Sequence, residues 1–171
     1  MRERVVVVGV DGSPASYNAL RWALSHPRCA AVRVRAIRCW MPVLARVWEA
    51  ALTDQPVPPI SALQAQAERE LADVVAAAVT RERLSPEVTV DQEVIRGPAG
   101  PVLVAQAGDA DLLVVGHARR LVEIRHRSVS WYCVRHAGCP VVIVPPPAGM
   151  HRLVARGTRG TLAVPLAGGT R

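Results

Sequence analysis

The stretch VVVVGVDGSPAS (residues 5–16) decides the fold, because it joins a β-branched run to a turn and the start of a helix. An uninterrupted apolar run of this kind is typical of a strand that is covered on both faces of a parallel sheet. Gly12 and Ser13 predict the turn, Ser13 can cap a helix, and Pro14 suits the first helical position. The helix is expected to end near residue 25, just before a proline.

The same alternation of strand and helix continues along the chain. Further strands are expected at 32–40, 87–95, 112–116 and 140–145, and further helices at 60–83, 98–107 and 128–137. Arginines interrupt 32–40, which favours a place away from the sheet centre, and the alternation in 87–95 suits an edge strand. Repeated strand–helix units imply parallel strands with right-handed crossovers. The sequence therefore predicts an α/β domain over residues 1–146, an open parallel five-stranded sheet with helices on both faces.

Two segments lie outside this regular pattern. Residues 42–59 contain four prolines and are interpreted as a lid or mobile loop. Residues 147–171 form a basic tail with glycine and proline and no period, which is expected to be disordered. Within the short helix at 98–107, Ala105 and Ala107 are expected to face the core.

The chain has a net charge of +7, and all of its 21 basic side chains are arginines, since it contains no lysine. Four of these arginines lie in the tail, which has no acidic residue: Arg152, Arg156, Arg159 and Arg171. The remaining charge of +3 lies on residues 1–145. This modest charge together with the basic tail favours a general attraction to polyanions and does not identify a partner. The sequence contains no recognisable helix-turn-helix motif and no pattern of aromatic and basic residues typical of a nucleic-acid surface, so nucleic acid is not the expected partner.

Membrane, metal and disulfide sites are not expected either. No apolar run reaches the roughly 18–20 residues that span a bilayer, and the apolar start is broken by Asp11 without a cleavage site. We therefore expect a cytoplasmic protein that does not enter a membrane. The cysteines lack metal-ligand spacing and are read as reduced thiols: Cys29, Cys39, Cys133 and Cys139.

Ligands of open α/β sheets lie beyond the carboxyl ends of the strands. Of the acidic residues at those ends, Asp11 alone has a plausible ligand role, although its carboxylate could equally only hold its own turn. No serine, cysteine or carboxylate accompanies a histidine in a nucleophile motif, so the chain is not expected to be an enzyme.

Four ordered segments carry a resemblance to a known family: GVDGSPAS (9–16), IRCWMP (37–42), DADLLVVG (109–116) and HAGCPVVIVP (136–145). They resemble the universal stress protein family. The resemblance implies a flavodoxin-like sheet with strand order 3-2-1-4-5. It also implies a homodimer paired through the last strand, residues Val141, Val142, Ile143 and Val144.

Some members of this family bind ATP, so ATP is the cofactor that the resemblance implies. Asp11 matches the acidic position after the first strand, and Cys39 matches a small residue that lines the adenine pocket. Gly116 matches the first glycine of the phosphate loop, and Ser128 its closing hydroxyl residue. The implied nucleotide-binding set is Asp11, Cys39, Gly116, Arg127, Ser128 and Val129.

The loop at 116–128 departs from the family pattern. It is two positions short, Arg119 stands where the second glycine belongs, and Arg127 replaces the last glycine. Glycine lets a phosphate approach bare backbone N–H groups, so we expect the usual cradle for a triphosphate to be lost. The arginines of the loop could replace the backbone amides, because a guanidinium can donate two hydrogen bonds to phosphate oxygens. Alternatively, they could only form a solvent-exposed face of the loop. Ser128 could likewise be only a helix N-cap.

These features predict a non-enzymatic regulatory protein of the universal stress type that senses a nucleotide or another anion weakly. A polyanion-binding protein acting through the arginine-rich tail and loop is one alternative. A nucleotide-hydrolysing relative is the other, but the sequence shows no acidic pair to hold magnesium near the phosphates.

Overall fold

The computed structural model describes residues 3–25, 32–41, 59–82, 88–117 and 128–147. Within them the elements follow the predicted order: β1 (Arg4–Gly9), α1 (Pro14–Ser25), β2 (Val32–Trp40), α3 (Ile60–Glu82), β3 (Val88–Arg96), α4 (Ala99–Gln106), β4 (Leu112–Gly116), α5 (Val129–His136) and β5 (Val141–Val144). Every strand and helix expected from the sequence is present, with bounds that differ by two residues at most.

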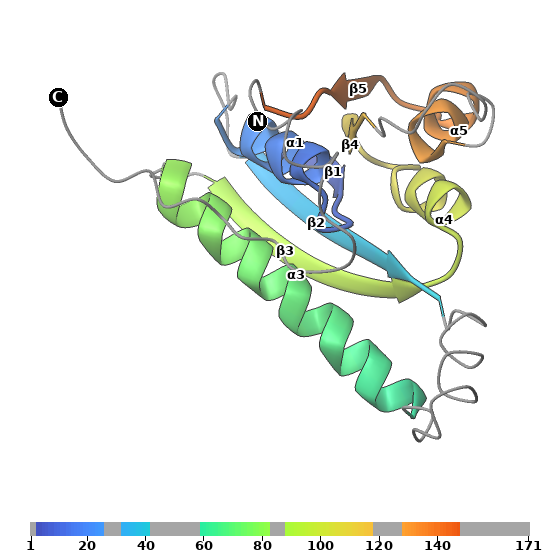
Figure 1. Cartoon of the computed structure of the whole chain (residues 1–171). Helices are drawn as coiled ribbons and strands as arrows, with labels where there is room; N and C mark the ends of the chain where they lie inside the picture. The colour runs from blue at the N-terminus through green and yellow to red at the C-terminus, as the bar shows by residue number, and fades with distance from the viewer. Residues whose placement is uncertain (1–2, 26–31, 42–58, 83–87, 118–127, 148–171) are drawn as a thin grey trace, which may run out of the picture.

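The strands form one five-stranded parallel sheet in the order β3-β2-β1-β4-β5. The predicted fold class and strand order are therefore confirmed. β1 is central, β2 lies off centre and β3 is an edge strand, as the composition of each strand indicated. Figure 1 shows α1 and α3 on one face of the sheet and α4 and α5 on the other.

Each face of the sheet has its own apolar core. Adjacent residues of β1, Val7 and Val8, are both fully buried, because one side chain points to each face. Val8 packs with the buried residues of α1 and α3, such as Leu20 and Leu71. Val7 belongs to the second core, under α4 and α5. The β-branched run at the start of the chain is thus the strand that both layers cover.

The helix starts follow from capping. Ser13 caps α1, since its Oγ accepts a hydrogen bond from Ser16 N at 3.2 Å. Ser128 caps α5 in the same way, accepting from Trp131 N at 3.2 Å. In α4 the prediction for Ala107 is confirmed, but that for Ala105 is wrong, because Ala105 is exposed.

The error at Ala105 has a simple geometric cause. The buried positions of this segment are Gly100, Leu103 and Ala107, which follow the helical spacing i, i+3, i+7. Ala105 lies two residues from Leu103 and Ala107, so it points away from that stripe.

The predicted lid at 42–59 and the predicted tail at 147–171 lie outside the described residues, apart from Pro59 and Pro147. The division into a domain at 1–146 and a tail therefore stays a prediction. Among the helices that the structure describes, none is both long and apolar enough to cross a membrane.

Candidate functional site

The turn after β1 carries the predicted carboxylate at the carboxyl edge of the sheet. Asp11 Oδ1 accepts a hydrogen bond from Ser13 N at 2.9 Å, and Asp11 N donates to Ser16 Oγ at 3.3 Å. Gly12, which lies between Asp11 and Ser13, has a φ of +81°, a backbone conformation that residues with a Cβ rarely adopt. The turn is therefore locked by its own residues, and Asp11 remains exposed at the edge.

The environment of Asp11 keeps its carboxyl group ionised. Partial burial raises its pKa, but hydrogen bonds from Ser13 and Ser16 and the charge of Arg38 outweigh that effect, so the pKa lies below its usual value of 3.8. The first interpretation of Asp11 is confirmed, because its carboxylate holds the turn. Its role as a ligand-binding residue stays a prediction, at the edge where ligands of this fold class bind.

Arg38 is a largely buried arginine near the Asp11 turn, for which the sequence indicated no role beyond interrupting a strand. It lies near the carboxyl end of β2, its side chain is only 16 % exposed, and Nη2 forms an ion pair with Glu70 Oε2 of α3. Gln66 supports the pair by donating to Glu70 Oε1 at 2.8 Å. The available signal was the strand alternation, which puts Arg38 on the same face as the buried Val34 and the buried Ala36 of β2.

Cys39 follows Arg38 and therefore points to the opposite face of the sheet. It is half-buried and packs against the core that contains Cys133. Burial, with a smaller effect of Cys133, raises the pKa of the Cys39 thiol to about 11. Cys133, which is fully buried, has its pKa raised to about 11 mainly by burial. At neutral pH these thiols are protonated and are weak nucleophiles.

Gly116 ends β4 directly against the first turn of α1. A Cβ added at this position would lie 2.6 Å from the carbonyl carbon of Ala15 and 2.6 Å from Ser16 N. These are backbone atoms of a helix and cannot move aside as a side chain could. Gly116 therefore has a packing role beside the Asp11 turn, whether or not it also belongs to a phosphate loop.

The remaining predicted residues divide into two groups. Ser128 and Val129 begin α5, where Ser128 acts as the N-cap and Val129 is 38 % exposed. Arg127, like the rest of 118–127, lies outside the described residues, so its predicted role stays a prediction. The structure brings Asp11, Cys39 and Gly116 to one edge of the sheet.

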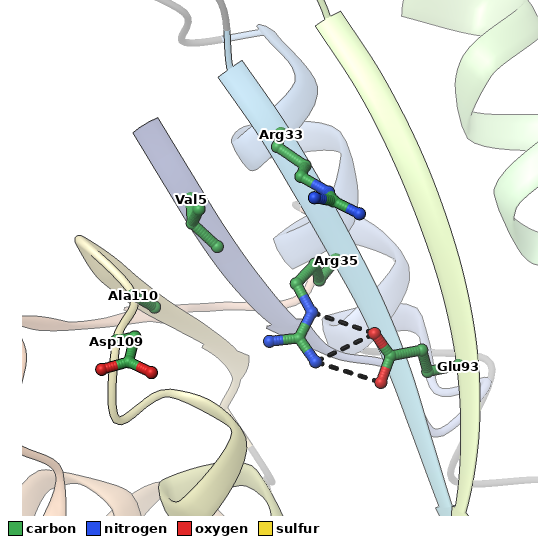
Figure 2. A pocket seen from close by; sticks show the side chains of 6 residues that line it. All are labelled: Val5, Arg33, Arg35, Glu93, Asp109 and Ala110. Atoms are coloured by element: carbon green, nitrogen blue, oxygen red, sulfur yellow. Dashed lines mark hydrogen bonds and ion pairs between the residues drawn. The ribbon is translucent and has the colours of Figure 1, made fainter. Parts of the chain in front are cut away.

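A hollow of about 320 Å³ lies at the opposite, amino-terminal end of the strands. Figure 2 shows Arg35 of β2 turned toward Glu93 of β3, with Asp109 and Ala110 on the other side of the hollow. Arg35 Nε and Nη2 donate to Glu93 at 2.9 and 3.0 Å, and Nη2 also donates to Gln106 Oε1 at 2.7 Å. These donors are already used by the protein, so the hollow is a less suitable ligand site than the carboxyl edge.

Ion pairs of this kind explain how β2 tolerates three arginines. Arg33 pairs with Asp91, Arg35 with Glu93, and Arg38 with Glu70. In the part of the chain that the structure describes, no group of three histidine, cysteine or acidic side chains could hold a metal ion.

A family model described as "Universal stress protein family" matches residues 3–145 of this chain. Universal stress protein Rv2623 of Mycobacterium tuberculosis is 33% identical over 143 residues, which are 81% of this chain and 46% of that protein. Universal stress protein Rv2624c of the same organism is 28% identical over 144 residues, 82% of this chain and 48% of that protein. The chain thus spans about half the length of the curated relatives that it matches.

Solved structures share the fold. A universal stress protein in complex with cAMP is 24% identical, with a TM-score of 0.54 over 84% of this chain and 98% of that chain. Together with the family model, which covers nearly all of the predicted domain, the comparisons establish that the chain belongs to the Universal stress protein family.

Proposed function

We propose that this chain is a non-enzymatic, cytoplasmic regulatory protein of the stress response that binds an adenine nucleotide at the carboxyl edge of its sheet. The observation that carries the proposal is the turn at Asp11, which presents an exposed and ionised carboxylate between β1 and α1. A structural neighbour was solved in complex with cAMP. A carboxylate at this position can accept hydrogen bonds from the hydroxyl and amino groups of a nucleoside.

A regulatory role agrees better with the site than catalysis does. The pKa of Cys39 and of Cys133 is about 11, so neither thiol is an activated nucleophile. Because the loop at 116–128 has lost two glycines of the family pattern, we propose that a triphosphate is held no better than a monophosphate.

The protein would act as a homodimer that pairs through β5. This strand is at the edge of the sheet, where unpaired backbone groups favour the addition of another strand. Ile143 is 40 % exposed, and Trp131 and Val134 on the neighbouring α5 are 40 % and 47 % exposed. Pairing two copies would cover part of this apolar surface.

Thermal unfolding with added ligand tests the nucleotide proposal. A ligand that binds only the folded state stabilises it by about 2.7 kcal/mol at a hundred times its Kd, so millimolar AMP, cAMP or ATP should raise the Tm by several degrees. Asp11→Asn keeps an acceptor for the turn but removes the charge, and should abolish most of the shift. If no adenine nucleotide raises the Tm of the unmodified protein at millimolar concentration, the proposal is wrong.

A further inference from the structure

Arg38 has a buried hydrogen-bond donor without a partner. Its Nη2 is engaged by Glu70, but Nη1 is buried and no hydrogen-bond acceptor is in reach of it within the described structure. An unsatisfied buried donor is costly, and such a group in a folded protein usually has a functional reason or a missing partner. Hydrophobic contact alone does not explain why a cation stands on this otherwise apolar face of β2.

The unpartnered nitrogen lies at the carboxyl edge. Ile37 O accepts a hydrogen bond from Val10 N at 2.9 Å, so Arg38 stands beside the end of β1 and the turn that follows it. Nη1 would lie 3.4 Å from a Cβ on Gly12, and the charge of Arg38 helps to lower the pKa of Asp11. The donor and the exposed Asp11 carboxylate therefore flank the same turn.

The charges around Arg38 indicate what kind of acceptor fits. The guanidinium is paired with the carboxylate of Glu70, and its charge also acts on the nearby carboxylate of Asp11, so two negative charges already offset its single positive charge. A phosphate brought to Nη1 would be repelled by both carboxylates. An uncharged acceptor, such as a ring nitrogen, a carbonyl or a ribose hydroxyl, meets no such repulsion and satisfies the donor.

We propose that Arg38 is a nucleoside-recognition residue, whose Nη1 donates to an uncharged acceptor on the base or ribose beside Asp11. This inference rests on the proposed nucleotide function. Because Nη1 is buried, the proposed contact requires a small movement of the guanidinium that uncovers this nitrogen at the edge. Glu70 is 43 % exposed and can follow that movement, so Nη2 keeps its ion pair. The site then selects the nucleoside, and the number of phosphates contributes little to affinity.

Isothermal titration calorimetry with adenosine, AMP, ATP and inorganic phosphate tests this assignment. The unmodified protein should bind adenosine, AMP and ATP within about threefold of one another, and inorganic phosphate should not compete. Arg38→Met keeps an apolar stem and removes the donors, so it should weaken adenosine and AMP equally, by about tenfold or more. Arg33→Met is the matched control, because Arg33 is an ion-paired arginine on the opposite face of the same strand, and it should change nothing.

Arg38→Lys provides a second variant if Arg38→Met does not fold. Lysine can keep the ion pair with Glu70 but lacks the second terminal nitrogen of a guanidinium, so its affinity for adenosine and AMP should also fall about tenfold. The proposal is overturned if either folded variant binds adenosine as the unmodified protein does, and the nucleotide function then stands. It is also overturned if the variants lose AMP but keep adenosine. If the unmodified protein binds none of the three ligands, the proposed function fails together with the inference.

Discussion

Replacing Gly116 by alanine separates the packing role of this residue from any role in a phosphate loop. The added Cβ would lie 2.6 Å from two backbone atoms of α1, at Ala15 and Ser16. Carbon atoms pack best at about 3.5–4.0 Å, so the overlap approaches 1 Å and can be relieved only by moving β4 and α1 apart. Both elements belong to the core that includes Leu20 and Val114, so their separation also loosens the packing there.

We expect Gly116→Ala to lower the free energy of unfolding by about 3 kcal/mol, the upper end of the range for overpacked cores, since the colliding atoms are backbone. Urea denaturation followed by circular dichroism measures it. With a slope of about 2 kcal/mol per molar urea, the midpoint should fall by about 1.5 M. No nucleotide needs to be present.

Gly138→Ala is the control for this experiment. A Cβ at Gly138 would meet no atom within 4 Å, and its φ is not positive. Its free energy of unfolding should stay within about 0.5 kcal/mol of that of the unmodified protein, as for most surface substitutions. A Gly116→Ala protein that unfolds at the same urea concentration as the Gly138→Ala protein would refute the packing argument.

Four further changes test other parts of the account. Folding lowers the pKa of Asp11, so the unmodified protein should have a higher free energy of unfolding than Asp11→Asn at pH 7, and this difference should disappear as the pH falls through 3.8 and below. A difference in urea midpoint that stays constant with pH would contradict this. Ser128→Ala should cost about 1 kcal/mol in the same assay through loss of the N-cap, and no change in midpoint would exclude that role. Alkylation of Cys39 by iodoacetamide at pH 8, followed by mass spectrometry, should be roughly a hundredfold slower than in unfolded chain, because a pKa of about 11 leaves little thiolate; rapid labelling of the folded protein would show an activated thiol. Ile143→Asp should convert the proposed dimer to a monomer in light scattering, and an unmodified protein that is already monomeric would rule out pairing through β5.

The fold could be predicted because local signals agree with one another. The β-branched run before Gly12, the cap at Ser13 and the proline at the first helical position all indicate the same strand–turn–helix unit, and the structure contains it. Alternation in β3 correctly indicated an edge. Ala105 was misplaced, because this short helix is apolar nearly all round, and a single polar side chain, Gln106, does not mark which face is exposed.

The candidate site was only partly predictable. Asp11 and Gly116 could be proposed from their places at strand ends, but the contact of Gly116 with the backbone of α1 depends on how two elements pack in space. Arg38 was read as one of three interruptions in a strand. Its importance comes from Glu70 on α3, thirty-two residues away, and no local pattern links the two.

We place the nucleotide site at the carboxyl edge of the sheet, around Asp11. A titration of ¹⁵N-labelled protein with AMP, followed by two-dimensional NMR, shows which amides a bound nucleotide affects. We expect saturable shifts at the amides of Gly12, Ser13, Cys39 and Gly116, with Val5 and Ala110 unchanged at the other end of the strands. Shifts confined to the hollow beside Arg35, or no shifts at all at millimolar AMP, would contradict it.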